Sequence, residues 1–474
     1  MFSATKNNVL LSAWQTTLAE CGSFPAIFSV NLEILRSYAD IETEALLWME
    51  KLVAFEKGDV VAVQIGNKPS WPAILLASLR LGLVVLPLGT HIERAEYEIA
   101  LSTCRVRGRI AVQNEELMCE RLDVAPFHWD DPQPDLLKLT SGTTSAPRAI
   151  RFRAHQLLAD AVNICDTMGF GNGDINFGVI PFSHSYGFSN LITPLLCRGV
   201  SLVCSEDRLP RAILNGLASS GATVFPGMPV FYQKLAESEN PPLLPRLRLC
   251  ISAGAPLLKN VALGFSRKFS LKIHTFYGAS ECGGIGYDAS DALEYEDGFA
   301  GAPMKNVAIH FREDSGESLI DVRSDAVGDG YFPQAEPGTL SDGRFTPSDL
   351  LENNATGMRV AGRVSDVINV AGRKLNPMEV EAQLLHFPGV RQVVVFGIPS
   401  SLRHEEAVAC IAGTACAADL MAYAHSVLSA WQVPKDIWIV DEIPANERGK
   451  INRRELARQY AVAQTANLRP SVVQ

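Results

Sequence analysis

Short apolar runs alternate with longer segments of helical length along most of the chain. Residues 59–65 (DVVAVQI) and 83–88 (LVVLPL) predict buried strands. Between them, residues 70–81 have the length and apolar content of a helix, with Pro72 in its first turn. The same rhythm returns at residues 178–180, 200–204, 223–225, 247–252 and 273–276. Such alternation predicts parallel sheets covered by helices, with the active site on loops at the carboxyl ends of the strands.

From about residue 300 the pattern changes to short strands separated by Gly, Asp and Ser. Residues 307–311, 318–323 and 338–346 predict a small antiparallel sheet or barrel. A compact unit then begins near residues 362–365. We therefore predict an α/β fold with a large N-terminal domain at residues 1–362, made of parallel sheets, helices and a small β-barrel-like part. A small α+β C-terminal domain is predicted at residues 363–474.

Composition and charge place the chain among globular proteins. Apolar residues make up 47% and charged residues 20% of the 474 positions, which argues against disorder. The formal charge of −10 argues against a protein that coats nucleic acid or an anionic membrane surface. The most apolar stretch, residues 71–88, is interrupted by Arg80, Gly82 and Pro87, so we expect no membrane span.

Cysteine and histidine usage predicts a reduced, cytoplasmic protein without a zinc site. The ten cysteines form no CxxC pair, and the nine histidines form no HxxxH or HExxH pattern. Residues 1–14 contain one lysine and only a very short apolar run, which is not the pattern of a signal peptide. We therefore expect thiols that pack as small hydrophobic side chains.

The strongest local signal is the hydroxyl-rich stretch at residues 139–148, LTSGTTSAPR. Its hydroxyls, the unhindered N–H groups around Gly142 and the cation of Arg148 are what a loop needs in order to hold a polyphosphate. Taken alone, such a stretch is more often an ordinary flexible surface loop. The GxxxxGK pattern of P-loop nucleotidases is absent.

Three further segments carry weaker signals. In residues 276–281 (FYGASE) the ring can stack on a base and Glu281 can hold Mg²⁺ against phosphate, although a capped Tyr–Gly turn is the commoner explanation. In residues 345–349 (FTPSD), with Arg363 downstream, the carboxylate can accept ribose hydroxyls or simply belong to a turn. Lys450, taken alone, is a solvated lysine in a basic patch.

Taken together and in this order, the four segments resemble the superfamily of adenylate-forming enzymes. It includes acyl-CoA synthetases, adenylation domains and firefly-type luciferases. Its phosphate loop, roughly (S/T)SGTTGxPK, stands here as residues 140–148. Its YGxTE motif stands as residues 277–281, and its SGGAP-like turn as residues 252–256.

The later motifs of the family correspond in the same way. The Asp of its TGD motif maps to Asp349, the Arg of its GRxxD motif to Arg363, and its late catalytic lysine to Lys450. Residues 372–381 (GRKLNPMEVE) resemble its GxxxxPxEIE segment. The resemblance implies ATP and AMP contacts at Thr140, Ser141, Gly142, Thr143, Thr144, Gly254, Ala255, Pro256, Tyr277, Gly278, Ala279, Ser280, Asp349 and Arg363.

The resemblance implies a two-step reaction that uses ATP, Mg²⁺ and CoA. A carboxylate displaces pyrophosphate from ATP and forms an acyl-adenylate, with alignment and charge neutralisation supplying most of the acceleration. The predicted catalytic residues are Arg148 on the β- and γ-phosphates, Glu281 as the Mg²⁺ ligand, and Lys450 between the two reacting anions. The mobile C-terminal domain of the family then rotates, which would bring the face that carries Gly372 to guide the thiol.

The sequence departs from the family pattern at several positions. Ser145 replaces the usual Gly and Arg148 the usual Lys of the phosphate loop, and Arg is not a neutral exchange for Lys. Residues 347–348 are Pro–Ser where Thr–Gly is usual. The hinge position, often Asp or Lys in the family, is Ser365 with Asp366 next to it, so both are candidate hinges.

The family builds its acyl pocket from loops near the strand ends. Residues 181–187 (PFSHSYG) resemble its PxxHxxG segment, so His184 is a candidate pocket wall or, equally, a hydrogen-bonded structural histidine. Gly187, Gly227 and Gly283 are further candidate lining residues. No charged side chain in these segments stands out as a partner for an amino acid, which favours an apolar carboxylic acid, fatty or aromatic.

The leading hypothesis is an AMP-forming acyl-CoA synthetase, with CoA as the thiol co-substrate. An acyl-AMP ligase that loads the phosphopantetheine thiol of an acyl carrier protein shares the first step and stays open. A nucleotide-binding protein of the same fold without turnover is the second alternative, and the joint presence of Glu281, Asp349, Arg363 and Lys450 speaks against it. A kinase or ATPase would need the absent lysine loop and would release ADP in place of AMP.

Overall fold

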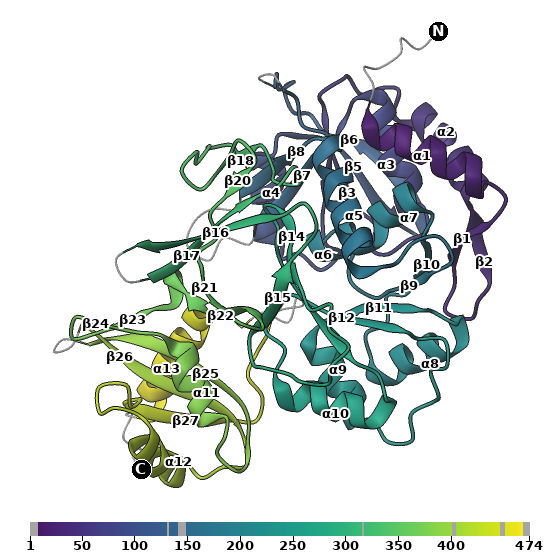
Figure 1. Cartoon of the computed structure of the whole chain (residues 1–474). Helices are drawn as coiled ribbons and strands as arrows, with labels where there is room; N and C mark the ends of the chain where they lie inside the picture. The colour runs from purple at the N-terminus through teal and green to yellow at the C-terminus, as the bar shows by residue number, and fades with distance from the viewer. Residues whose placement is uncertain are drawn as a thin grey trace, which may run out of the picture. The chain divides into compact units, whose positions relative to one another are not determined.

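The structure is a computed structural model that describes residues 8–129, 132–140, 148–314, 317–400, 404–445 and 451–467. The chain divides into two compact units, coloured along the sequence in Figure 1. Unit 1 comprises Met1–Phe311, Asp321–Pro347 and Thr356–Met358, and unit 2 comprises Arg312–Ile320, Ser348–Ala355 and Arg359–Gln474. The boundary between residues 362 and 363 stays a prediction.

Unit 1 contains a seven-stranded sheet in which the two strands predicted at residues 59–65 and 83–88 lie side by side. The strand order is β18-β8-β7-β4-β3-β5-β6. Strands β7, β4, β3 and β5 are parallel, whereas β18, β8 and β6 run antiparallel to their neighbours. The bounds are β3 Val60–Gln64, β4 Val84–Pro87, β5 Val106–Gln113, β6 Glu116–Arg121, β7 Leu136–Thr140, β8 Arg148–Phe152 and β18 Gly330–Phe332.

The second sheet of unit 1 has a parallel centre and antiparallel flanks. Within the unit its order is β2-β1-β10-β9-β11-β12-β13-β14-β15. Strands β1, β10, β9, β11, β12 and β13 are parallel, and β2, β14 and β15 are antiparallel to their neighbours. The bounds are β1 Pro25–Phe28, β2 Ile34–Ser37, β9 Ile175–Gly178, β10 Ser201–Cys204, β11 Val224–Gly227, β12 Leu249–Ser252, β13 Ile273–Ala279, β14 Gly283–Tyr287 and β15 Phe299–Pro303.

The helices of unit 1 pack around these sheets, and local sequence explains their ends (Figure 1). Helix α3 (Trp71–Leu81) has Pro72 in its first turn and ends at Gly82, whose φ of 67° is left-handed. Helix α2 (Tyr38–Leu52) begins after Ser37, which caps it. The others are α1 Val9–Cys21, α4 Arg94–Thr103, α5 Ala154–Met168, α6 Ser185–Gly187, the π-helix η1 Phe188–Ile192, α7 Thr193–Arg198, α8 Pro210–Ser220, α9 Pro229–Glu237 and α10 Lys259–Phe269.

One strand lies earlier in the chain than the sequence predicts. The apolar pattern predicts a strand at residues 178–180, whereas β9 begins at Ile175 and ends at Gly178. Asn176 interrupts the apolar run, yet it is fully buried, and its side-chain amide donates to the Asn190 carbonyl oxygen at 2.9 Å. A buried amide with a partner is tolerated inside a strand, and the hydrophobic pattern alone cannot reveal that partner.

The small antiparallel sheet predicted after residue 300 is present. Its order is β16-β17-β20-β19. In unit 1, β20 pairs antiparallel with the end of β17 and with β19. The bounds are β16 Ala308–Asp314, β17 Glu317–Arg323, β19 Leu340–Ser341 and β20 Arg344–Phe345.

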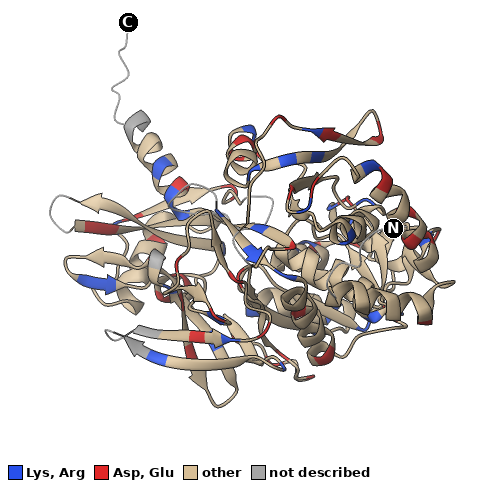
Figure 2. Ribbon diagram, turned by 90° about the horizontal axis from the view of Figure 1, so that it is seen from above, with Lys and Arg blue, Asp and Glu red and all other residues tan. Residues whose placement is uncertain are grey.

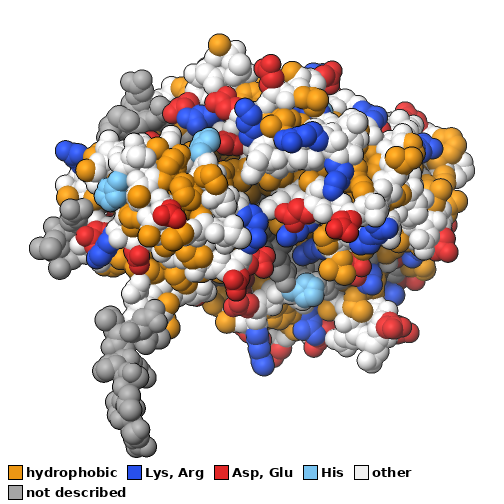
Figure 3. All heavy atoms as spheres, turned by 90° about the horizontal axis from the view of Figure 1, so that it is seen from below, with side chains coloured by type: hydrophobic (Ala, Val, Ile, Leu, Met, Phe, Trp, Pro, Cys, Tyr) orange, Lys and Arg blue, Asp and Glu red, His pale blue; other side chains and the backbone are white. Residues whose placement is uncertain are grey.

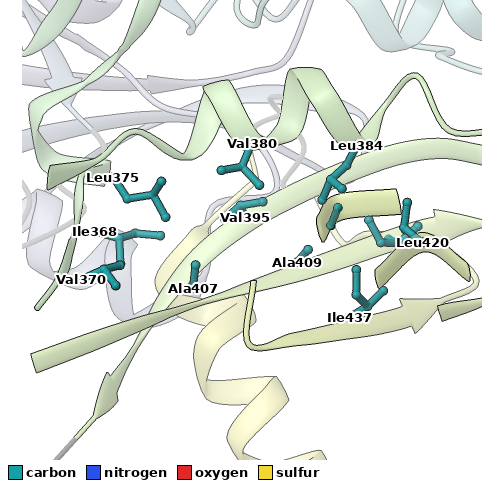
Figure 4. Packing of buried hydrophobic residues seen from close by; sticks show 12 residues of the cluster. Ile368, Val370, Leu375, Val380, Leu384, Val395, Ala407, Ala409, Leu420 and Ile437 are labelled. Carbon is teal, nitrogen blue, oxygen red and sulfur yellow. The ribbon is translucent and has the colours of Figure 1, made fainter. Parts of the chain in front are cut away.

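The sheet of unit 2 has a hydrophobic layer on each face, and successive residues of its central strands point alternately into one layer and the other. Its central hairpin is formed by β25 and β26, and β27 runs parallel to β26. Figure 4 shows Val395, Ala407 and Ala409 facing the residues of α11 and α12. The alternate positions Phe396 and Val408 pack on the other side with residues of α13. The bounds are β21 Asp349–Asn354, β22 Gly357–Arg363, the 3-10 helix η2 Val364–Asp366, β23 Ile368–Val370, β24 Arg373–Leu375, α11 Pro377–Leu384, β25 Val390–Ser400, β26 His404–Gly413, α12 Ala417–Val427, β27 Asp436–Val440 and α13 Arg453–Asn467.

Charged residues are distributed over the helices and strands of both units (Figure 2). On the face drawn in Figure 3, acidic and basic side chains are interspersed among hydrophobic ones, as a moderate net charge of −10 suggests. Among the described residues, no helix has both the length and the hydropathy that crossing a membrane requires.

Candidate active site

The carboxyl ends of β11, β12 and β13 lie side by side in the second sheet. Gly227, Ser252 and Thr275 occupy matching positions on these three parallel strands. Residues 254–256, the predicted adenine-contact turn, follow β12 and are exposed. Residues 277–281 lie at and just beyond the end of β13. The structure therefore brings these two predicted segments to one edge of the sheet, as expected for a fold of parallel strands.

Glu281 lies in the tight turn between β13 and β14. Gly283, at the start of β14, has a φ of 70°, which favours glycine. A Cβ atom on Gly278 would lie 2.6 Å from the Gly283 carbonyl oxygen, so the backbone itself requires the glycine of the Tyr–Gly motif. The Ser185 hydroxyl donates to the Ser280 hydroxyl at 3.0 Å and ties the turn to α6.

The two ends of the predicted phosphate loop are held together. Thr140 at the end of β7 pairs with Arg148 at the start of β8, and the Thr140 hydroxyl donates to the Arg148 carbonyl oxygen at 3.1 Å. Ser141, Gly142, Thr143 and Thr144 lie outside the described residues.

Arg148 and Glu281 are joined through Tyr331. The Arg148 guanidinium stacks on the Tyr331 ring, with its Cζ atom 3.7 Å from the ring centroid. The Tyr331 hydroxyl donates to Glu281 Oε1 at 3.1 Å. Arg148 also forms an ion pair with Glu336. These contacts define the Arg148–Tyr331–Glu281 cluster, which connects the start of β8, at the end of the predicted phosphate loop, to the turn after β13.

The pairing of β18 with β8 explains why Tyr331 reaches both partners. Tyr331 lies opposite Ile150 on β8, two residues beyond Arg148. Burial and the nearby Glu281 carboxylate raise the pKa of Tyr331 far above its usual value, although the Arg148 cation opposes this shift. Tyr331 therefore stays protonated and acts as a hydrogen-bond donor to Glu281.

The acidic residues fit Mg²⁺ only when a nucleotide supplies the remaining ligands. Within the described part of the chain, no group of three or more His, Cys, Asp or Glu side chains is arranged to hold a metal ion. Glu281 offers a half-buried carboxylate at the sheet edge. Mg²⁺ is commonly held by one or two carboxylates together with substrate phosphates. The donor set therefore suits a magnesium nucleotide.

His184 caps the short helix α6. Its Nδ1 atom accepts a hydrogen bond from the Tyr186 N–H at 3.1 Å, which assigns the ring proton of the neutral form to Nε2. The Tyr186 ring lies 5.8 Å from the Phe276 ring, and its hydroxyl donates to the Ile251 carbonyl oxygen. His184 thus has a structural role at one nitrogen, and its place in an acyl pocket stays a prediction.

The three glycines predicted to line the acyl pocket have close neighbours within the protein. A Cβ atom would lie 2.1 Å from the Pro181 carbonyl oxygen at Gly187 and 3.0 Å from the Tyr232 ring at Gly227. At Gly283 it would lie 2.0 Å from Asp160 Oδ1. Close packing against the backbone at Gly187 and against side chains at Gly227 and Gly283 therefore accounts for these glycines, and contact with a substrate stays a prediction.

The predicted ribose pair meets within unit 2. Asp349 begins β21 and Arg363 ends β22, and the Arg363 Nε atom donates to Asp349 Oδ1 at 2.5 Å. Asp349 is buried, whereas Arg363 is largely exposed. A carboxylate accepts hydrogen bonds and a guanidinium donates them, so the chemistry of the pair suits the two hydroxyls of a ribose.

The two candidate hinge residues lie in the 3-10 helix η2. The Asp366 carboxylate accepts from the Nε atom of Arg453 at 3.1 Å. Arg453 also forms an ion pair with Glu381 and donates to the Val395 carbonyl oxygen at 2.7 Å. These contacts fasten the end of η2 and the start of α13 to the sheet of unit 2, and Ser365 precedes the fastened residue.

Of the two remaining predicted residues, the structure describes Gly372 but not Lys450. Gly372 is exposed with a φ of 84°, and a Cβ atom there would have no other atom within 4 Å. Its N–H donates to the Asn369 side-chain oxygen at 2.9 Å. Lys450, the predicted catalytic lysine, lies outside the described residues.

The sequence motifs did not reveal Tyr331, Lys138 or Asp160. Tyr331 lies in a short segment, GYF, that carries no sign of its partners. Lys138 offered a signal, because it is a lysine inside the apolar strand LLKLT. Asp160 is likewise an acidic residue on a face of α5 that is otherwise largely apolar.

Comparison with known proteins identifies the class of protein. Residues 25–332 match the family model of the AMP-binding enzyme, and residues 379–450 match that of the AMP-binding enzyme C-terminal domain. The chain therefore belongs to the AMP-binding enzyme family, within the adenylate-forming superfamily.

Several relatives cover nearly the whole chain. The feruloyl-CoA synthase of Amycolatopsis sp is 26% identical over 443 residues, which cover 85% of this chain and 89% of that protein. The benzoate–CoA ligase of Thauera aromatica is 25% identical over 453 residues, covering 84% and 85%. The crystal structure of ATP-bound MatB from Rhodopseudomonas palustris has a TM-score of 0.83 at 22% identity, over 94% of this chain and 98% of that one. This structural likeness supports the predicted fold.

Proposed function

We propose that the protein is an AMP-forming acid–CoA ligase that activates an apolar carboxylic acid, fatty or aromatic. The observation that carries this proposal is the Arg148–Tyr331–Glu281 cluster, which links the predicted phosphate loop to the predicted adenine-and-metal motif by direct contacts. Membership of the AMP-binding enzyme family supports the chemistry, and the names of the feruloyl-CoA and benzoate–CoA relatives support the thiol and the apolar acid.

In the first step, a carboxylate oxygen of the acid attacks the α-phosphorus of ATP. The bond from this phosphorus to the bridging oxygen breaks, and pyrophosphate leaves with the bonding electrons. Arg148 would bind the β- and γ-phosphates, and the Asp349–Arg363 pair would hold the ribose. Lys450 would reduce the repulsion between the carboxylate and the α-phosphate. Glu281 would hold Mg²⁺, which would supply positive charge close to the pyrophosphate leaving group.

In the second step, the sulfur of CoA attacks the acyl carbon, the bond to the adenylate oxygen breaks, and AMP leaves. Gly372 would face the thiol substrate, and the open space around it leaves room for an extended chain. Because Arg453 fastens Asp366 within unit 2, Ser365 is the better candidate for a hinge that turns this unit between the two steps.

The aromatic pair Tyr186 and Phe276 supports the choice of an apolar acid. Both rings are buried close to the strand ends at which the reacting groups would meet. Such rings stabilise an apolar chain or ring by burial and offer no charged partner for an α-amino group.

The proposal is tested by measuring pyrophosphate release from ATP with a panel of aromatic and fatty acids, followed by thioester formation. We expect AMP and pyrophosphate in equal amounts with at least one apolar acid, and a thioester with CoA. Release of ADP, or no pyrophosphate with any acid, would contradict the proposed function. A thioester formed only on a phosphopantetheinyl carrier protein would move the assignment to the acyl-AMP ligase.

A further inference from the structure

Asn67 is a buried asparagine just beyond the carboxyl end of β3, and it binds the carboxyl ends of two strands of the other sheet. The residue is 6% exposed. Its side-chain oxygen accepts from the Phe182 N–H at 2.9 Å, so the amide uses both its donor and its acceptor groups. Its side-chain N–H groups donate to three backbone carbonyl oxygens, those of Gly178 at 2.8 Å, Ile180 at 3.0 Å and Ser205 at 3.1 Å. Asn67 therefore joins β3 to the ends of β9 and β10, at the sheet edge where active sites of such folds lie.

The backbone that Asn67 binds leads from β9 to α6. Residues 179–184 join these two elements outside any helix or strand, and we call them the β9–α6 connection. Within it, Val179, Ile180 and Phe182 are each at most 2% exposed. Buried backbone groups need hydrogen-bond partners, and outside a sheet or helix these come from side chains or water. Asn67 supplies such partners, so it fixes the course of the β9–α6 connection.

The β9–α6 connection ends at His184, a predicted residue of the acid pocket. The His184 N–H donates to the Pro181 carbonyl oxygen at 3.0 Å, one residue before the N–H that Asn67 holds. The next residue, Ser185, donates its hydroxyl to the Ser280 hydroxyl at 3.0 Å. Ser280 belongs to the predicted adenine-and-metal motif. The backbone that Asn67 fixes therefore continues directly into the residues that lie between the predicted acid pocket and that motif.

Glu206, just beyond β10, holds the main chain at Asn67. Its Oε1 atom accepts from the Asn67 N–H at 3.0 Å, and hydrogen bonds to an ionised acceptor are stronger than neutral ones. Gly66 has a φ of 64°, and a Cβ atom on it would lie 2.3 Å from Glu206 Oε1, so the carboxylate packs against bare backbone. The Lys68 Nζ atom lies 3.8 Å from Glu206 Oε2. The Glu206 side chain is 53% exposed, so it can be replaced without opening the core.

The nucleotide motif at residues 277–281 has a support of its own. The motif belongs to the hairpin of β13 and β14, and the Tyr331 hydroxyl donates to Glu281 at 3.1 Å. Neither contact involves Asn67. Loss of the Asn67 side chain should therefore disturb the acid pocket much more than the nucleotide site.

We propose that Asn67 is a positioning residue for the acid substrate: it fixes the β9–α6 connection, and this connection places His184 and Ser185 at the acid pocket. Asn67 acts through the residues that it holds. The inference rests on the proposed function, because only an enzyme that activates an acid makes use of a pocket there. Sites depend on such support, since a displacement of about 1 Å can lower a rate about 100-fold.

The test uses the full-length protein and, as the acid probe, the aromatic or fatty acid of the panel that gives the wild type its highest rate of pyrophosphate release. The KM for this acid, the KM for ATP and Tm are measured for the wild type, Asn67→Ala and Asn67→Asp. Asp keeps an acceptor for the Phe182 N–H but turns an oxygen toward the three carbonyl oxygens. We expect both variants to raise the KM for the acid at least about tenfold, with the KM for ATP within about threefold of the wild type.

Amide hydrogen exchange gives a readout that does not depend on turnover. Peptides that cover residues 179–187 should exchange at least about tenfold faster in Asn67→Ala than in the wild type, because the Phe182 N–H has lost its acceptor. Peptides that cover residues 277–287 should exchange at nearly the wild-type rate, because the hairpin of β13 and β14 keeps its own hydrogen bonds.

Asp59→Asn is the matched control. Asp59 is 4% exposed and lies at the amino end of β3, the end opposite Asn67, where its Oδ1 atom pairs with Arg107 at 2.6 Å. Its replacement leaves Arg107 buried without an anion and should lower Tm. Both KM values and the exchange of residues 179–187 should stay within about twofold of the wild type, because this end of the strand is distant from the β9–α6 connection.

Glu206→Ala is a milder variant that keeps the Asn67 side chain but removes the acceptor of its N–H. It should raise the KM for the acid about threefold, with the KM for ATP unchanged. If both Asn67 variants fail to fold, Glu206→Ala decides, and an unchanged KM for the acid in this variant then overturns the inference.

Equal rises in the KM for the acid and the KM for ATP overturn the inference, and so do unchanged values of both. Faster exchange of residues 179–187 without a change in the KM for the acid also overturns it, because Asn67 would then be purely structural. If the wild type releases no pyrophosphate with any acid of the panel, the proposed function fails and the inference with it; wild-type turnover with unaffected Asn67 variants refutes the inference alone.

Discussion

Removal of the Tyr331 hydroxyl tests how strongly MgATP binding depends on the orientation of the Glu281 carboxylate. Tyr331→Phe removes the donor that lies 3.1 Å from Glu281 Oε1 but keeps the ring on which Arg148 stacks. A hydrogen bond to a charged group contributes about 1.5–3 kcal/mol, and Tyr331 is too buried for water to replace it freely. Since about 1.4 kcal/mol corresponds to a factor of ten, we expect the KM for MgATP to rise about 10- to 100-fold.

The assay is pyrophosphate release at varied ATP and varied Mg²⁺, with Tm measured on the same samples. Tyr460→Phe is the control, because the Tyr460 hydroxyl also donates to a carboxylate, that of Asp436 at 2.6 Å in unit 2. Both variants should lose some stability, but only Tyr331→Phe should require more ATP and Mg²⁺. Wild-type ATP and Mg²⁺ dependence in Tyr331→Phe would refute the role assigned to the Arg148–Tyr331–Glu281 cluster.

Three other predictions concern the predicted catalytic lysine, unit 2 and pH. Lys450→Ala should abolish adenylate formation yet spare thioester formation from supplied acyl-AMP; equal loss of both steps would refute its role. Arg453→Met leaves the carboxylates of Asp366 and Glu381 without their cation and should cost about 3 kcal/mol in urea unfolding, and a loss under about 1 kcal/mol would contradict this. Burial lowers the pKa of His274 from its usual 6.5, so the unfolded chain binds more protons and Tm should fall as pH drops below about 6.5. Tm of His274→Gln should fall less over that range, and parallel pH profiles would contradict the assignment.

The repeated strand and helix pattern was sufficient to predict both parallel sheets and the covering helices. Strands such as β3 and β4 are buried on both faces, so they read as continuous apolar runs. Strand β9 was misplaced because it contains the buried Asn176, whose side-chain N–H donates to a residue of another element. A hydrophobic pattern records which positions avoid water, but it does not record hydrogen-bond partners distant in the chain.

The family motifs predicted site residues whose chemistry is visible in short segments. Arg148 and Glu281 were predicted in this way, and the structure brings them to one cluster. Tyr331 could not be predicted, because its role arises from the pairing of β18 with β8 and not from its neighbours in the chain. Asp160 was detectable as an acidic residue on a largely apolar face of α5, but its hydrogen bond to the Gly284 N–H depends on the packing of α5 against β14.

The sheet of unit 2 has apolar layers on both faces, and each layer is completed by helices of the same unit. Unit 2 therefore buries its hydrophobic residues with its own helices. Both layers are formed by residues 368–460, so residues 364–474, which follow β22, are a natural segment to exchange with the corresponding segment of a relative in a chimera.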